Sequence, residues 1–350
     1  MKTAIIHLDQ THPLENVLLK RAAIRLNELE KPDSIIFSGR ARELPKELKC
    51  LFSMPESPDF LGVHPSPLTE VPFQILIVEN GVIDQITLQT PPELCLSDFH
   101  IHTSLAYCNV DMNSATAVQL GKFFGLKSMA FTEHSGQLYV SADDYWHDRY
   151  NPNGLASCKI ISRTAEYRQL LDKFTSDVVL PGYELDSDQY GRPIILPEDF
   201  KYSEIRLAAI HQVMNPKDLA DGKREFMLRA ENLCAWGLDI LAHPFRVFQW
   251  NKHSAPKELY RPLAKLLHDA NVAAELNFHA NTPDPDFYRI CLEEGTMIAL
   301  GSDSHQMAEI GNFHQHLNLL KTLNNCKLPT EQIFRHNNLR FRKNKEILSC

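Results

Sequence analysis

From about Leu94 onward, short apolar runs alternate with longer amphipathic segments, and this alternation most constrains the fold. Seven runs, rich in isoleucine, valine, leucine and alanine, end in LSDFHIHT, SMAFTEH, VVLPGYE, LAAIHQ, ILAHP, VAAELNF and MIALGSDSH. Helical periodicity marks the segments between them, at 113–124, 159–174, 217–236, 257–270 and 284–294. Alternating strands and helices predict a parallel sheet with crossover helices. Seven such units in roughly 230 residues favour a closed α/β barrel over an open sheet.

Residues 1–94 lack this alternation. A helix is expected at 16–29 and a strand at 34–38, followed by a stretch dotted with prolines at 45–72. Residues 73–88 form two apolar runs around Asn80-Gly81, which is a strong hairpin signal. We therefore predict two domains: a small α+β appendage of unknown role at 1–94 and the barrel at 95–350.

Composition excludes several classes of protein. The 350 residues include 36 lysines and arginines against 44 acids, a net charge of -8 that is not typical of broad nucleic-acid or anionic-membrane binding. Eight cysteines without a C-x-x-C pair argue against a zinc ribbon or thioredoxin-type site and favour reduced thiols in a cytoplasm. The first residues do not have the pattern expected of a signal peptide, and the sequence has no run of 18 apolar residues, so we expect neither a signal peptide nor a membrane span.

Nearly every apolar run ends in a potential metal ligand. In chain order these residues are His100, His102, His134, Glu184, His211, His243, Asp303 and His305. The carboxyl ends of barrel strands meet at one face, so we expect these side chains to converge there. His100 and His102 are two residues apart, as are Asp303 and His305, which points both members of each pair the same way. Imidazole and carboxylate are ligands of zinc, manganese or iron, so the pattern predicts a polynuclear site in which Glu184 can bridge two ions.

The ordered series D-F-H-I-H-T, T-E-H, G-Y-E, A-I-H, A-H-P and G-S-D-S-H resembles the PHP family, named for polymerase and histidinol phosphatase. The resemblance covers about residues 95–320. It implies a distorted seven-stranded (β/α)7 TIM-like barrel with a trinuclear metal centre that hydrolyses phosphate esters. T-E-H in place of T-D-H, and the helical E-Y-R-Q-L-L before G-Y-E, favour the histidinol-phosphate phosphatase branch. The appendage at 1–94 is not part of that branch's usual plan.

The same resemblance implies how the ligands are shared among three ions. It assigns His100, His102, Glu184 and Asp303 to the first ion, Glu184, His211 and His243 to the second, and Cys108, His134 and His305 to the third. Cys108 stands where many members have histidine. A thiolate can replace imidazole on zinc and suits manganese less well. The alternative is that Cys108 is a buried cysteine that binds no metal.

Three acids are catalytic candidates. Asp303 could accept a proton from water while it ligates metal, or could serve as a ligand alone. Asp98, just before the first histidine pair, is expected to orient a ligand imidazole. Glu133 could do the same or donate a proton near the leaving group.

Substrate contacts are expected at the same face. Arg246, just beyond the A-H-P motif, could clamp a phosphate with its guanidinium; the alternative is a surface salt bridge. Asn277 and His279, at the end of the sixth run, are expected to contact substrate. A specificity loop after the second run would contain Tyr139, Trp146 and Arg149.

The predicted function is hydrolysis of a phosphate monoester, with histidinol phosphate as a candidate, by a hydroxide that two or three divalent transition metal ions generate from water. Zinc, iron and manganese are the candidate ions, and a small phosphorylated molecule is the expected partner. A barrel amidohydrolase is an alternative, but it usually has a carboxylated lysine on its fourth strand, where this chain has His211. A nuclease or nucleotide phosphoesterase, and a metal-binding scaffold without catalysis, remain further alternatives.

Overall fold

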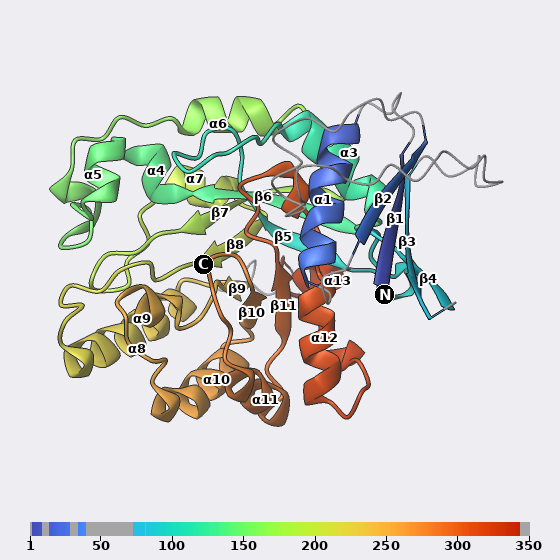
Figure 1. The fold of residues 1–350 in the computed structure, drawn as a ribbon. Helices are drawn as coiled ribbons and strands as arrows, with labels where there is room; N and C mark the ends of the chain where they lie inside the picture. Colours follow the sequence, from blue (N-terminus) through green and yellow to red (C-terminus); the bar gives the residue numbers. More distant parts are fainter. Residues whose placement is uncertain (1, 9–13, 29–33, 40–72, 81, 344–350) are drawn as a thin grey trace. The chain divides into compact units, whose positions relative to one another are not determined.

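The computed structural model describes residues 2–8, 14–28, 34–39, 73–80 and 82–343 (Figure 1). The chain divides into two compact units, Met1–Thr90 and Pro91–Cys350. The proline-dotted stretch at 45–72 lies outside the described residues. In the part of the chain that is described, no helix is long and apolar enough to cross a membrane.

The first unit is a four-stranded sheet with one helix. Its strands have the order β2-β1-β3-β4, with bounds β1 Lys2–Leu8, β2 Ser34–Gly39, β3 Phe73–Glu79 and β4 Val82–Ile86, and its helix is α1, Glu15–Glu28. β1 pairs in parallel with β2 and antiparallel with β3. The hairpin predicted at Asn80 is confirmed, since Glu79 of β3 pairs with Val82 of β4 and Asn80 has a φ of 51°. The sequence analysis missed β1, while the expected α+β appendage is confirmed.

The second unit is the predicted barrel. Seven parallel strands follow one another in chain order, with bounds β5 Ser97–Ile101, β6 Ser128–His134, β7 Val179–Leu185, β8 Ile205–Ala208, β9 Ile240–Leu241, β10 Ala273–Asn277 and β11 Ile298–Gly301. Hydrogen bonds nearly close the sheet between its first and last strands: His102 N donates to Ser304 O over 3.0 Å, and Ser304 N to His100 O over 3.2 Å. The α/β TIM-like barrel is therefore confirmed.

Helices connect the strands and lie outside them (Figure 1). Their bounds are α3 Ser114–Phe123, α4 Ser135–Tyr139, α5 Ala142–Trp146, α6 Thr164–Leu171, α7 Pro197–Tyr202, α8 Leu219–Ala235, α9 Arg246–Trp250, α10 Tyr260–Asp269, α11 Pro285–Glu294, α12 His314–Leu323 and α13 His336–Lys343. Capping side chains set several starts: Asn113 accepts a hydrogen bond from Thr116 N, and Asp218 accepts one from Ala220 N. The helix expected at 159–174 is shorter than predicted, since residues 159–163 and 172–174 are not helical.

The barrel interior is apolar below the strand ends. One buried cluster takes at least one side chain from each of the seven strands, together with Phe334 and Leu339 from the end of the described chain. Phe334 contacts Phe99 of β5 edge to face, with ring centroids 5.9 Å apart. This packing fixes the strands and leaves their carboxyl ends to carry the polar side chains described next.

Candidate metal centre

The strand ends bring together the predicted histidines and carboxylates. Within the described residues, four groups have potential ligand atoms within 4.8 Å of one another: His102, His134 and His305; His100, His102 and Asp303; His100, Glu184 and His243; and His134, Asp186 and His211. All but one of the predicted ligands are members. Cys108 is absent from these groups, and Asp186 is a member that the sequence analysis missed.

Glu184 lies at the middle of the centre. Its Oε1 atom is 2.9–3.5 Å from the Nε2 atoms of His100, His211 and His243. Its other oxygen, Oε2, is 2.6 Å from His134 Nδ1 and 3.7 Å from His102 Nε2. The two oxygens therefore face different sets of imidazoles, as a carboxylate shared by two ions would.

Asp303 provides the second carboxylate. Its Oδ1 atom is 3.0 Å from His102 Nε2 and 3.4 Å from His100 Nε2. The backbone of Asp303 is left-handed, with a φ of 51°, and that of His243 has a φ of 30°. Non-glycine residues rarely adopt this conformation, which often occurs at functional sites.

Four of the potential ligand atoms are buried without a hydrogen-bond partner, as expected of atoms that would bind a cation. The atoms are His100 Nε2, His134 Nδ1, Glu184 Oε2 and His211 Nε2. Buried polar atoms normally have partners, since an unsatisfied one costs about 1–3 kcal/mol. Two ligand atoms on one tetrahedral zinc ion are about 3.3 Å apart, close to the separations around Glu184. The residues present therefore fit a transition metal ion.

The positively charged groups of the cluster keep its two central carboxylates ionised. Burial favours neutral carboxyl groups, but His134 and His100 outweigh it and hold the pKa of Glu184 well below its usual range. Burial is likewise outweighed at Asp303, whose pKa is held well below its usual range by His100 and Arg246. Both carboxylates are therefore ionised and able to bind a cation at neutral pH.

The pKa values of the imidazoles are shifted in two opposite directions. Burial lowers the pKa of His211, but Glu184 and Asp186 overcome this and raise it to about 9. For His102 the carboxylates of Asp303 and Glu133 likewise overcome burial and raise the pKa to about 9. Burial and the positive charge of His102 lower the pKa of His305 to about 3.

A buried glutamate that the sequence analysis missed orients His100. Glu275 Oε1 is 2.7 Å from His100 Nδ1, and its Oε2 accepts a hydrogen bond from His243 N over 2.8 Å. Glu275 lies against Gly301 so closely that a Cβ atom there would be 1.8 Å from Oε1. The available signal was the spacing, because Glu275 is two residues before Asn277 and shares its face of β10.

Asp186 orients His211 in the same manner. Its Oδ1 atom is 2.8 Å from His211 Nδ1, and Oδ2 accepts a hydrogen bond from Gly136 N over 2.8 Å. This leaves His211 Nε2 facing Glu184. Here too the signal was a two-residue spacing, from Glu184 to Asp186.

Glu133 and Asp98 have different contacts. Glu133 Oε1 is 3.1 Å from His102 Nδ1, and Oε2 accepts hydrogen bonds from Thr103 N and Thr103 Oγ1. Burial is outweighed by His102, which lowers the pKa of Glu133 to about 2, so this acid orients an imidazole and is a poor proton donor. Asp98 instead accepts hydrogen bonds from the backbone N–H groups of His100, Ser302 and Gly311, and burial raises its pKa to about 6.

Asp98 therefore differs from the expectation that it orients an imidazole ring. Its hydrogen bonds run from β5 to the backbone after β11, across the seam of the barrel. The side chain fixes the backbone that presents Asp303, rather than a ligand itself.

Cys108 lies beside the cluster. Its Sγ atom is 3.7 Å from His134 Nε2, and Gln137 Nε2 donates to it over 3.6 Å. Burial raises the pKa of the Cys108 thiol to about 12. The structure thus brings Cys108 next to one of the two histidines proposed to share an ion with it.

Arg246 is buried, which does not fit the alternative of a surface salt bridge. Its Nη1 atom donates to Asp303 Oδ2 over 2.6 Å, and Nη2 is 2.6 Å from His243 Nε2. The ring of Trp250 lies 4.6 Å from the guanidinium carbon. The positive charge therefore lies directly beside the cluster.

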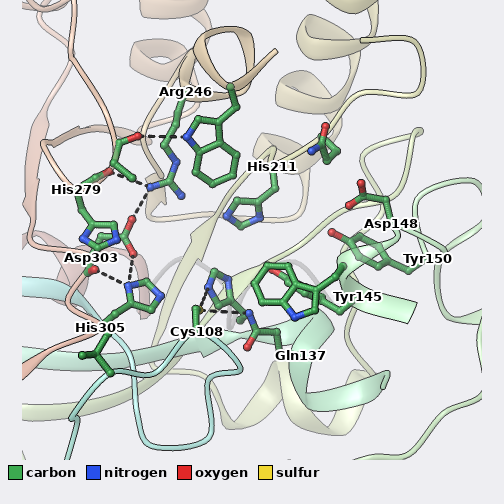
Figure 2. Close-up of a pocket in the computed structure, with 16 residues that line it drawn as sticks. Cys108, Gln137, Tyr145, Asp148, Tyr150, His211, Arg246, His279, Asp303 and His305 are labelled. Atoms are coloured by element: carbon green, nitrogen blue, oxygen red, sulfur yellow. Dashed lines mark hydrogen bonds and ion pairs between the residues drawn. The ribbon is translucent and has the colours of Figure 1, made fainter. Parts of the chain in front are cut away.

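A cavity of about 300 Å³ opens over the centre, and Arg246, His279, Asp303 and His305 line one end of it (Figure 2). Asn277 is fully buried beneath this end; it donates to Glu275 and Asp303 and does not line the cavity. In the expected specificity loop, Trp146 lines the cavity, Tyr139 is buried against Asp199, and Arg149 is exposed and pairs with Asp143 and Asp144.

Comparison with known proteins finds a relative that is named as a phosphatase. A protein of Clostridium novyi (strain NT), named "Probable phosphatase", is 26% identical over 250 residues, which span 67% of this chain and 88% of the relative. No family model matches the chain.

Proposed function

We propose that this protein is a metal-dependent phosphomonoesterase of the PHP type, with histidinol phosphate as a candidate substrate. The observation that carries the proposal is the position of Glu184, whose two oxygens face two sets of imidazoles. Its own Oε2 and three imidazole nitrogens around it have no hydrogen-bond partner. The relative's name and the order of the motifs support the same activity. We propose a small phosphorylated molecule as its partner and the cytoplasm as its location.

Two or three divalent ions, held by the predicted ligands with Cys108 as the added donor at the third position, would lower the pKa of a water molecule and neutralise phosphate oxygens. Zinc, iron and manganese fit the mixture of nitrogen and oxygen donors. The surrounding acids keep these imidazoles in place: Glu275 holds His100, Glu133 holds His102 and Asp186 holds His211.

The remaining roles fall to residues around the cavity. Arg246 offers paired donors beside Asp303 and cannot act as a base, because arginine stays protonated. It would bind phosphate oxygens at this end of the cavity. Asp303 Oδ1 faces His100 and His102, so this oxygen would serve as a metal ligand, while its other oxygen accepts a hydrogen bond from Arg246. The proton that the leaving-group oxygen takes up would come from water or from His279, which lines the same end of the cavity.

Other activities fit the site less well. The cavity, of about 300 Å³, has the size that holds a metabolite rather than a nucleic-acid strand. The bridging lysine of a barrel amidohydrolase has no counterpart among the described residues of this cluster. Glu184 of β7 lies in the middle of the cluster instead. A scaffold without catalysis would not require an arginine buried beside the cluster.

The deciding experiment is a panel of phosphate mono- and diesters and amides, assayed on protein whose metal content is quantified. Hydrolysis of monoesters, histidinol phosphate among them, in proportion to bound metal is the expected result. Hydrolysis of diesters or amides alone, or no hydrolysis by protein that contains two or more equivalents of metal, would overturn the proposal.

A further inference from the structure

The cavity over the metal centre has two chemically different ends. Arg246, His279 and Asp303 lie at one end, and Asp148 and Tyr150 lie at the other, with His211 between them (Figure 2). The first end suits an anion, as proposed for phosphate. The second end includes a carboxylate that the proposed hydrolysis does not use.

The carboxylate of Asp148 has no partner of its own. No hydrogen bond or ion pair reaches it from any side chain within the described ranges, although the residue is half-buried. Its backbone has a φ of 52° and its N–H group donates to Tyr145 O over 3.0 Å, so the turn that carries it is defined. Burial, with a further contribution from the charge of Asp186, raises the pKa of Asp148 to about 6. A cation beside it would reverse this effect.

The cations near Asp148 are engaged elsewhere. Arg229 is buried and bonds to Glu225, to Asn151 Oδ1 over 2.5 Å and to Ser187 O over 3.3 Å. The next residue along the chain, Arg149, pairs with Asp143, which is exposed, and with Asp144, which is partly buried. The charges of His211, Arg229 and His147 act on Asp148 from a distance, but within the described residues none of them forms an ion pair or a hydrogen bond with its carboxylate.

Aromatic rings form the wall around this carboxylate. Tyr145 stacks on Tyr150 with ring centroids 5.7 Å apart, and Trp146 meets Tyr145 edge to face at 5.1 Å. All three line the cavity. The electron-rich faces of tyrosine and tryptophan attract cations, and the attraction grows where water is excluded.

The segment that follows Asp148 is anchored by packing and hydrogen bonds. Tyr150 is 3% exposed, and Asn151, which follows it, binds Arg229 of α8 and accepts a hydrogen bond from Gln189 N over 2.8 Å. A recognition group that is already in place binds its ligand without a further entropic cost of ordering.

We propose that Asp148, with the rings of Tyr145, Trp146 and Tyr150, forms a subsite for a positively charged group, so that the enzyme selects phosphate monoesters that carry an ammonium group at the end opposite the phosphate. This inference rests on the proposed phosphomonoesterase activity. It assigns specificity to a residue that neither holds metal nor touches the phosphate.

The test uses two substrates of equal size, 3-aminopropyl phosphate and n-butyl phosphate, in which an ammonium group replaces a methyl group. With the metal-loaded protein, kcat/KM is expected to be about tenfold higher for the amine. A hydrogen-bonded charge pair in a partly buried site contributes binding free energy equivalent to about this ratio. Asp148→Asn keeps the shape and tolerates the same backbone conformation. It should remove the preference by raising KM for the amine alone.

Asp143→Asn is the matched control, because it removes the same charge from the same segment at an exposed position outside the cavity lining. The preference should survive in this variant. Equal kcat/KM for the two substrates in the wild type, or an equal loss for both in Asp148→Asn, would overturn the subsite while leaving the phosphatase proposal intact. Failure to hydrolyse either ester, or any other monoester, would instead count against the phosphatase proposal itself.

Discussion

Glu184 is the residue on which the proposed sharing of ions depends. Glu184→Gln keeps the shape but replaces one oxygen by an N–H donor and removes the charge that faces both sets of imidazoles. It should therefore cost more bound metal than His305→Ala, which removes a ligand at one edge. Elemental analysis after purification without chelator measures both. Equal losses would contradict the bridging role.

Arg246→Ala should raise KM for a small phosphomonoester by about tenfold, the equivalent of about 1.4 kcal/mol. The guanidinium lies against Asp303 at the cavity floor, where it can pair with phosphate oxygens. Its removal takes a positive charge away from His243 and Asp303, so metal content should not fall. Arg246→Lys should recover part of the binding, because an ammonium lacks the planar pair of donors.

Steady-state kinetics on metal-quantified protein checks these expectations. Wild-type KM and kcat in the alanine variant would make Arg246 a bystander. Loss of metal would instead show that it supports the ligands.

Cys108 tests the third metal position. If the thiolate binds zinc beside His134, Cys108→Ser should lower zinc content by about one equivalent and leave the other ions in place. Metal binding would also lower the pKa of this thiol, which burial raises in the metal-free protein, since a coordinating thiol is deprotonated. Full zinc content and full activity in the serine variant would make Cys108 a packing residue.

The sequence predicted which residues at the strand ends could bind metal. It did not predict which buried acids hydrogen-bond to those residues. The ligand positions follow from one rule, that the carboxyl ends of barrel strands meet. Glu275 and Asp186 required a second step, from a strand's last polar residue to the residue two places away. The contacts of Asp98 depend on how the first and last strands close, which no local pattern contains.

Among the elements, β5 to β11 were predictable because each is an apolar run buried on both faces. Short helices such as α4, α5 and α9 were not, since five residues carry too little periodicity. This matters because α5 and the turn after it supply one wall of the cavity. The part of the site that sequence describes least is therefore the part that would select the substrate.

The contact between β10 and β11 gives a prediction at this scale. Gly301→Ala would place a methyl group 1.8 Å from Glu275 Oε1, and Gly301 pairs with Asn277 in the sheet, so the backbone has little room to move. The displaced glutamate should release His100, lowering both metal content and the melting temperature. Gly222→Ala in α8 is the control, because the nearest atom to its Cβ would be 3.6 Å away. It should be neutral or slightly stabilising, by up to about 1 kcal/mol. Equal behaviour of the two variants in thermal unfolding and metal analysis would contradict the argument.

For the whole molecule, the barrel creates the centre by bringing residues that are up to about two hundred positions apart into one buried cluster, as Asp303 and His102 show. Seven repeated units favoured this closed barrel over an open parallel sheet. The number of subunits and the role of residues 1–94 leave no comparable pattern in the sequence. They depend on surfaces, where residue choice is weakly constrained.

The cluster as a whole also links metal uptake to pH. His102 and His211 have pKa values of about 9, raised above the ordinary value by the carboxylates, so both are protonated at pH 7 in the metal-free protein. A metal ligand must be a neutral imidazole, so binding releases these protons, and apparent affinity should rise with pH until about pH 9. His305, with a pKa of about 3, is already neutral and releases none.

Calorimetric titration of metal-free protein with zinc, in two buffers of different ionisation enthalpy, measures the number of protons released. About two protons per saturated centre are expected from these two residues, with a further contribution from His100, whose pKa the acids around it raise well above its usual range against the effect of burial. An affinity that does not change between pH 6 and pH 9 would mean that the imidazoles around Glu184 are neutral before the metal arrives, and that the carboxylates do not govern their charge.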